Sequence, residues 1–223
     1  MNKSVISKSI FNKTILILSF VSLLNDISSE MLYPILPIYF KSIGFSVLFI
    51  GMLEGFAEAI AGLSKGYFGK YSDLSGRRSP FITVGYAMSA ISKPMMVLIL
   101  QPLWVFFART LDRLGKGVRT ASRDAMLSDN SLPQNKAKVF GFHRGMDTLG
   151  AVIGPVIALI YLSYYPGDYR NMFLYAFIPA MAAVLLTLFL KDKKTQKVDS
   201  PDIRKYFSFL SYWKISGRQF RLL

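Results

Sequence analysis

The stretch Arg109-Thr-Leu-Asp-Arg-Leu-Gly-Lys-Gly-Val-Arg-Thr-Ala-Ser-Arg123 follows directly on an apolar run, Leu103 to Ala108. At about 100° per residue, its charged side chains fall within roughly a third of a helix circumference. Ionisable groups at membrane depth cost at least ~2.5–3.5 kcal/mol each, so they face a bundle interior or an aqueous cavity. We therefore expect a helix with one polar stripe, formed by Arg109, Asp112, Arg113, Lys116, Arg119 and Arg123.

Two interpretations of this stripe are open. Arg109 and Asp112 lie close to the apolar run, and we expect them to line a solute or proton pathway. Arg119 and Arg123 lie further along, where basic residues commonly end a helix at the lipid headgroups on the cytoplasmic side. We expect the headgroup position for this second pair.

The composition is that of a polytopic membrane protein. The chain has 223 residues, of which 52% are hydrophobic, and a mean hydropathy of +0.36. Its net charge of +14 comes mostly from Lys and Arg between apolar runs, as the positive-inside rule predicts, so we expect no nucleic-acid partner. Without cysteine, and with His143 as the only histidine, disulfides and multi-histidine metal sites are excluded. We expect neither a cofactor nor an enzyme, because no nucleophile and base are paired in the sequence.

Six apolar runs are long enough to cross a bilayer, which predicts an all-α membrane protein with six transmembrane helices. The last run carries no charge and is expected to face lipid. Lys93 is the one charge in the third run, and we expect it to snorkel or to pair. The six expected spans are Thr14–Phe40, Ser46–Phe68, Phe81–Leu100, Leu103–Met126, Val139–Leu162 and Met172–Leu190.

Two pairs of acidic residues lie four positions apart within expected spans. Asp26 and Glu30 share a helix face, and two like charges this close in a low dielectric favour protonation of one, as a proton carrier requires. The alternative is that both are permanently paired with basic residues of the bundle. Glu54 and Glu58 stand among small residues that allow close helix contact, so they face protein or water. Their alternative role is to pair with the Arg109 stripe.

The segment between the second and third spans carries the pattern Gly69-x-x-x-Asp73-x-x-Gly76-Arg77-Arg78. In this position the pattern resembles the loop signature of the major facilitator superfamily. The resemblance implies that Gly69, Asp73, Gly76, Arg77 and Arg78 form a cytoplasmic loop that gates the transporter. Asp73 would lie where a carboxylate can meet a helix N-terminus.

Two further features resemble the same family. Arg109 is similar to the arginine of the family's fourth helix, which is often linked to proton coupling. Gly150-Ala-Val-Ile-Gly154-Pro155 resembles the fifth-helix signature of the family's exporters. Small Gly150 and Gly154 permit close helix approach while Pro155 frees a backbone carbonyl, so the segment is expected to act as a hinge. Ordinary packing is the alternative for the two glycines.

The first turns of the fifth span hold His143, Arg144 and Asp147. We expect His143 to be a hydrogen-bonded packing residue. Arg144 and Asp147 join the candidate residues for proton coupling and the cavity. The full candidate set is Asp26, Glu30, Glu54, Glu58, Arg109, Asp112, Arg113, Arg144 and Asp147.

The resemblance also implies an architecture. Residues 1–191 would form one six-helix half-domain of two inverted three-helix repeats. Residues 192–223 would form a basic cytoplasmic linker with an amphipathic interfacial helix, containing Ile203 to Trp213. The linker would lead toward a second six-helix half that is missing or supplied by another chain. The distribution of Lys and Arg places both termini in the cytoplasm, and we expect the inner or plasma membrane of a bacterium.

The favoured function is a secondary active transporter that exports a small organic solute in exchange for protons. An importer or facilitator on the same fold is the second hypothesis. The third is a truncated six-helix membrane subunit that does not transport alone, because alternating access needs two halves. The expected partners are the lipid bilayer, a small-molecule substrate, protons and the second half.

Overall fold

The structure is a computed structural model that describes residues 12–192. This part of the chain is helical throughout and contains no β-strand. The interfacial helix expected at Ile203 to Trp213 lies outside the described residues. The elements are α1 (Lys13–Leu32), α2 (Leu36–Ser42), α3 (Val47–Ser75), α4 (Ser79–Leu98), α5 (Pro102–Asp129), the 3-10 helix η1 (Pro133–Asn135), α6 (Lys136–Tyr164) and α7 (Tyr169–Thr187).

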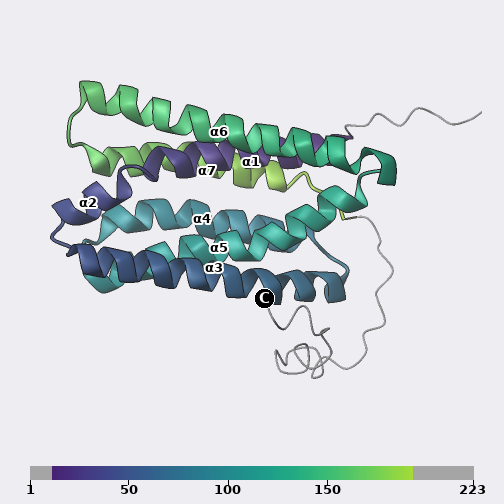
Figure 1. Cartoon of the computed structure of the whole chain (residues 1–223), viewed down its shortest axis with the longest axis horizontal. Coiled ribbons are helices and arrows are strands. Elements are labelled where there is room, and N and C mark those ends of the chain that lie inside the picture. Colours follow the sequence, from purple (N-terminus) through teal and green to yellow (C-terminus); the bar gives the residue numbers. More distant parts are fainter. Residues whose placement is uncertain (1–11, 193–223) are drawn as a thin grey trace, which may run out of the picture.

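The long helices form two groups of three (Figure 1). In the first group α1 packs against α6 and α7, and in the second α5 packs against α3 and α4. The groups are joined mainly where α4 packs against α7. These contacts are symmetric when α1, α3 and α4 are exchanged with α5, α6 and α7, respectively. The pair α1–α6 then becomes α5–α3, α1–α7 becomes α5–α4, and α4–α7 stays the same. The packing is therefore that of two structurally equivalent three-helix units.

Within residues 12–192, five helices are long and apolar enough to cross a membrane, namely α1, α3, α4, α7 and the segment Pro133–Tyr164 that contains α6. α5 has 28 residues, but the charged stripe makes it too polar for this group. Apolar composition thus identifies five of the six expected spans. Whether α5 can also cross the membrane depends on where its charged side chains lie.

The first expected span is not one helix, which corrects the prediction of Thr14–Phe40. α1 ends at Leu32, and a turn closed by a hydrogen bond from the Ile35 N–H to the Leu32 carbonyl leads into α2. Pro34 is the physical reason, because it has no N–H to donate to the preceding turn and its ring crowds that turn. Pro37 sits in the first turn of α2, where its missing N–H costs nothing.

The segment Gly69 to Arg78 is mostly helix rather than loop, which is a second correction. α3 continues to Ser75, and only residues 76–78 separate it from α4. Gly76 ends the helix in the left-handed conformation, with φ of 64°, which favours glycine. Gly69 packs so closely against α5 that a Cβ there would lie 2.7 Å from Cβ of Ala121. Gly69 thus allows α3 to lie close to α5 at this turn, and Arg77 is exposed in the short connection.

The last span is not simply a lipid-facing helix. Phe173, Ala176 and Ala180 of α7 are buried against α1 and α4. Ser28 of α1 donates a hydrogen bond to the carbonyl of Ala176, where the two helices meet. Only the opposite face, with Ile178, is exposed. An uncharged helix can pack against other helices on one face and against lipid on the other. The lack of charge in this span therefore did not predict that one face is buried.

Two apolar cores fill the ends of the bundle. One gathers Phe40, Phe173 and Met96 where α2 covers α4 and α7. The other gathers Ile15, Tyr86 and Leu127 near the beginnings of α1 and α4 and the end of α5. The polar side chains of α1 and α5 line one cavity, and they form the candidate site.

Candidate functional site: a charged cavity

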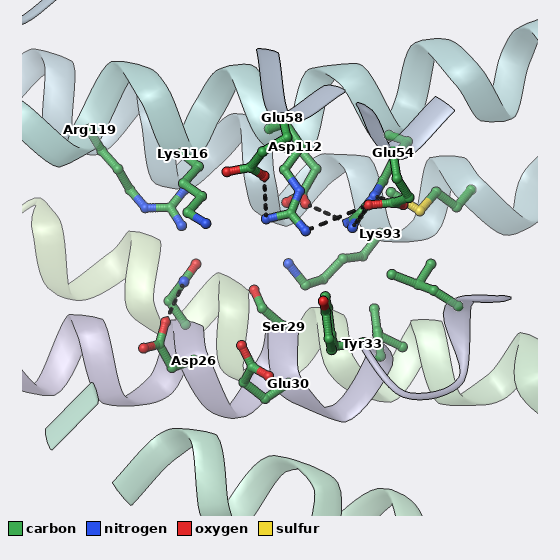
Figure 2. A pocket seen from close by; sticks show the side chains of 16 residues that line it. Asp26, Ser29, Glu30, Tyr33, Glu54, Glu58, Lys93, Asp112, Lys116 and Arg119 are labelled. Atoms are coloured by element: carbon green, nitrogen blue, oxygen red, sulfur yellow. Dashed lines mark hydrogen bonds and ion pairs between the residues drawn. The ribbon is translucent and has the colours of Figure 1, made fainter. Parts of the chain in front are cut away.

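A cavity of about 480 Å³ lies among α1, α3, α4 and α5 (Figure 2). Its size is within the range of small-molecule sites, but its lining is more polar than is usual for them. Ser29, Tyr33 and Met96 contribute to the lining. Its ionisable residues are five acidic and five basic side chains: Asp26, Glu30, Glu54, Glu58, Asp112, Lys93, Arg109, Arg113, Lys116 and Arg119.

Arg109 is the centre of the paired charges in this cavity. Its Nε lies 2.7 Å from Oε1 of Glu54 and its Nη2 lies 2.8 Å from Oε2, so the contact is two-pronged. Its Nη1 donates to Oδ2 of Asp112, one turn along α5, at 3.0 Å. Arg109 is only 4% exposed. A guanidinium buried to this extent is retained in a fold when carboxylates satisfy its donors, as they do here.

Arg113 extends the network from α5 to α3. Its Nη atoms lie 3.9 Å from a Glu54 carboxylate oxygen and 3.6 Å from one of Glu58. Glu54 and Glu58 therefore pair with the α5 stripe, which was the alternative role considered for them. Two arginines are thus paired with three carboxylates along the contact of α3 and α5, which leaves this cluster with one excess negative charge.

Arg119 and Arg123, for which we expected a headgroup position, have side chains that the bundle largely encloses. Arg119 is buried, donates to Oγ of Ser89 at 2.6 Å, and stacks its guanidinium 4.5 Å from the ring centre of Tyr86. Arg123 is mostly buried and donates to Oγ of Ser22 at 3.1 Å. Both side chains are enclosed because α5 packs on α4 and α3, and their depth in the membrane stays a prediction.

The acidic pair of α1 lies on the opposite side of the cavity. Asp26 and Glu30 point from α1 toward the gap between the two helix groups (Figure 2). Asp26 accepts a hydrogen bond from Nδ2 of Asn25 at 3.2 Å. Within residues 12–192, neither carboxylate has a basic nitrogen within 4.0 Å. The structure thus shows these two carboxylates unpaired and facing the cavity.

Lys93 is a cavity residue that the sequence analysis missed. Its side chain enters the cavity from α4 and is 2% exposed (Figure 2). Nζ donates to the carbonyl of Ser89 at 3.0 Å, one turn back along the same helix. A lone lysine in the middle of an apolar run was the available signal, because a charge at that depth has to face protein or water.

Arg144 and Asp147 do not line the cavity. The Arg144 side chain is 81% exposed and lies 3.6 Å from Asp147, which is buried. His143, also buried, has Nε2 3.8 Å from Oδ1 of Asp147. In the described part of the chain His143 has no hydrogen-bond partner, contrary to expectation. These residues are on α6, which packs behind α1 and is thereby separated from the cavity.

Two of the five expected gating residues, Asp73 and Arg78, belong to a separate network at the helix ends. Arg78 bridges two carboxylates, with Nη1 2.7 Å from Asp73 of α3 and Nε 2.7 Å from Asp129 of α5. The backbone N–H groups of Arg78 and Ser79, where α4 begins, both donate to Oδ1 of Asp192 at 2.9 Å. The network therefore connects the ends of α3, α5 and α7 to the N-terminus of α4, and sequence reasoning missed Asp192.

Gly150 and Gly154 lie where α6 crosses α1. A Cβ on Gly150 would lie 2.7 Å from the carbonyl oxygen of Leu23, and one on Gly154 would lie 2.7 Å from that of Ile27. Both glycines therefore allow α6 to pack closely on α1, which was the alternative considered for them. Pro155 follows inside α6, which continues to Tyr164.

A family model of the Major Facilitator Superfamily matches residues 18–222. The chain belongs to this superfamily. Superfamily members are transporters rather than enzymes. An uncharacterized MFS-type transporter of Methanocaldococcus jannaschii is 35% identical over 182 residues, which cover 82% of this chain and 46% of that protein. A multi-drug resistance efflux pump PmrA homolog of Lactococcus lactis is 26% identical over 171 residues, covering 73% and 42%.

The solved structure of the human organic anion transporter MFSD10 has the same fold. Its TM-score is 0.70 at 17% sequence identity, and the match covers 86% of this chain and 51% of that one. The chain thus spans about half the length of the curated relatives that it matches.

Proposed function

We propose that this chain forms one six-helix half of a secondary active transporter that exports a small organic solute in exchange for protons. The observation that carries the proposal is the cavity, in which free carboxylates of α1 face a paired cluster around Arg109. Efflux relatives support the direction, since the Lactococcus protein is named a multi-drug resistance efflux pump homolog and an Aspergillus niger relative is named a citrate exporter.

Six spans, including α5, are part of this proposal. The support is that the charges of α5 face α3, α4 and the cavity, where carboxylates pair with Arg109 and Arg113 and a hydroxyl accepts from Arg119. A helix with its polar stripe so enclosed can present its other face to lipid. The equivalent packing of α1, α3, α4 and of α5, α6, α7 supports two inverted repeats. The Lys and Arg distribution supports cytoplasmic termini.

In the proposed mechanism, Asp26 and Glu30 carry the proton. A carboxylate binds a proton more tightly when it loses water, and releases it when a cation approaches. Both acids are free of ion pairs, so their surroundings can change without breaking a structural contact. The Arg109 cluster, in contrast, holds α5 against α3 and fixes the opposite side of the cavity. Solute binding and proton binding would then alternate with the opening of the two sides of the membrane.

A second half is required for alternating access. The exposed face of α3 supports its docking there. Along that face, a Cβ on Gly51, Gly55, Gly62 or Gly66 would meet no atom of the described residues within 4 Å. A smooth row of glycines permits another helix to approach closely. We propose that a helix of the second half covers this row.

The network at Arg78 is proposed to control the conformational equilibrium. It holds the ends of α3, α5 and α7 together, so it has to loosen or move as a unit when that side opens. Asp73→Asn should reduce transport by the completed transporter while leaving membrane insertion intact. Unchanged transport by this variant would argue against the assignment.

The central test of the function uses a chimaera. The chain is fused to the part of the Methanocaldococcus relative that it does not match, and the product is reconstituted into liposomes with a pre-set pH gradient. A panel of organic solutes should include some that dissipate the gradient. Asp26→Asn should abolish this proton flux while solute counterflow persists, and Lys41→Gln, an exposed change on α2, serves as the control.

Each hypothesis predicts its own result in this assay. Solute movement that is insensitive to the gradient would favour a facilitator. Gradient-driven uptake would favour an importer. If no solute moves through the chimaera or the chain alone, the interpretation as a non-transporting subunit is supported instead.

A further inference from the structure

The two sides of the cavity carry opposite net charge. On α1, Asp26 and Glu30 contribute two negative charges. The side formed by α3, α4 and α5 carries five basic and three acidic residues, a net of two positive charges. The basic residues are Lys93, Arg109, Arg113, Lys116 and Arg119, and the acidic ones are Glu54, Glu58 and Asp112.

Salt bridges pair only the charges of this lining that lie next to α3. Arg109 and Arg113 take up Glu54, Glu58 and Asp112. No carboxylate oxygen lies within 4.0 Å of Lys93, Lys116 or Arg119 in the part of the chain that the structure describes, although Asp112 is the acidic residue that acts most strongly on Lys93. The three unpaired cations on α4 and α5 face the two unpaired anions on α1 (Figure 2).

Lys93 is the most informative of these groups. It is almost fully buried, yet its only hydrogen bond within residues 12–192 goes to the Ser89 carbonyl, so two of its three N–H donors are unused. Arg119 differs, because Ser89, the Gly85 carbonyl and the Tyr86 ring already surround it. A buried ammonium with free donors that points into a cavity is suited to an anionic group of a ligand.

A singly charged solute would satisfy one side of this cavity and leave the other uncompensated. An anion would bind Lys93 but meet Asp26 and Glu30 across the gap. A cation would have the reverse problem. A solute that carries both charges offsets both sides, and electrostatic complementarity of this kind selects among ligands.

We propose that the cavity binds a zwitterionic solute, with its cationic group toward Asp26 and Glu30 and its anionic group toward Lys93 and Lys116. The inference rests on the proposed transport function, because it names the solute class of the same cavity. It assigns Lys93 a direct binding role. It also gives α1 a second task, since a carboxylate that holds the solute's cationic group cannot hold a proton at the same time.

Matched probes can test the inference by binding alone. The 223-residue chain in lipid nanodiscs is titrated with β-alanine, 4-aminobutanoate and 6-aminohexanoate, which differ in the distance between their charges. Each is compared with the carboxylate and the amine of the same chain length. At least one zwitterion should bind roughly tenfold or more tightly than both of its singly charged analogues, because a charge-assisted hydrogen bond contributes about a factor of ten.

Variants then assign the two ends. Lys93→Met should remove the advantage of the zwitterion over the amine, and Asp26→Asn should reduce its advantage over the carboxylate. Lys41→Met, on the exposed surface of α2, should change neither ratio. Equal effects of Lys93→Met on zwitterion and amine would overturn the inference, since a purely structural role for Lys93 predicts that outcome.

The result separates this inference from the proposed function. No preference for any zwitterion, or no binding of any probe, would overturn the inference even if the chimaera transports other solutes. Selective zwitterion binding without any transport by the chimaera would support the inference and contradict the proposed function.

Discussion

Arg109 and Glu54 are joined by two parallel hydrogen bonds, Nε to Oε1 at 2.7 Å and Nη2 to Oε2 at 2.8 Å, across the contact of α5 and α3. This geometry matches a planar guanidinium to a carboxylate in a way that a lysine cannot reproduce. Because Arg109 also holds Asp112, one side chain fixes the charged stripe relative to the neighbouring helix. The rigid side of the cavity is built on this contact.

Arg109→Gln should destabilise the folded chain. The substitution removes the two-pronged partner of Glu54, which keeps only the 3.9 Å contact with Arg113, and the 3.0 Å partner of Asp112. Removing one member of a buried pair costs about 3–5 kcal/mol, and we expect the lower end because the Glu54 side chain is 35% exposed. Equilibrium unfolding in mixed detergent measures the loss, with Arg77→Gln in the exposed connection as the control. A cost below about 1 kcal/mol, typical of surface pairs, would contradict the enclosed position of the stripe.

Gly154→Val should disrupt the crossing of α1 and α6. Its Cβ would lie 2.7 Å from the Ile27 carbonyl oxygen and 2.9 Å from the Met31 nitrogen, so backbone has to move. Overpacking of this kind costs about 1–3 kcal/mol. Gly145→Val is the matched control on the same helix, because a Cβ there meets no atom of the described residues within 4 Å. Equal unfolding free energies of the two variants would contradict the close packing of Gly154 against α1.

Asp192→Ala should weaken the start of α4. Oδ1 of Asp192 accepts from two backbone N–H groups that have no partner inside the helix, as a helix-capping side chain does. Loss of a cap costs about 1 kcal/mol. Asp73→Asn is the comparison, since the Asp73 side chain is 58% exposed and its pair with Arg78 should contribute less. Amide hydrogen exchange at Ser79, Phe81 and Ile82 should accelerate in the Asp192 variant alone. Equal protection in both variants would refute the cap.

Asp168 should make the α6–α7 connection sensitive to acid. Its carboxylate accepts from Oη of Tyr161 at 2.6 Å and from Nδ2 of Asn171 at 2.8 Å, and these hydrogen bonds hold the pKa of Asp168 below its usual value. A group whose pKa is lowered by folding stabilises the fold above its unfolded-state pKa, about 3.9. That stabilisation is lost as the pH falls through the lower folded-state value. The melting temperature of Asp168→Asn should therefore approach that of the wild type below about pH 4. A difference that does not change with pH would contradict this.

The charged stripe could be predicted because it depends on local geometry alone. The angular spacing of Arg109, Asp112, Arg113 and Lys116 puts them on one face whatever the helix packs against, and all four line the cavity. The approximate spans followed from the lengths of the apolar runs for the same reason. The family followed from Asp73 and its neighbours in the segment between the second and third spans.

Features that depend on distant partners could not be predicted. Arg119 is buried because Ser89 and Tyr86 of α4 surround it, and no pattern within α5 reveals that. Asp192 caps a helix that begins more than a hundred residues earlier. In the sequence, Lys93 is only an isolated charge in an apolar run. Whether its side chain points into the cavity depends on how α4 packs on α5.

The central claim is that the cavity is an aqueous site inside the membrane, and the cysteine-free sequence allows a direct test. In Ser29→Cys the single thiol lies on the cavity lining, and in Val152→Cys it lies on the exposed, apolar outer face of α6. Both variants are treated in lipid nanodiscs with a charged, membrane-impermeant methanethiosulfonate. We expect the cysteine at position 29 to react and the one at position 152 to react only after unfolding. A position 29 thiol that stays unreactive until the chain is unfolded would contradict the account.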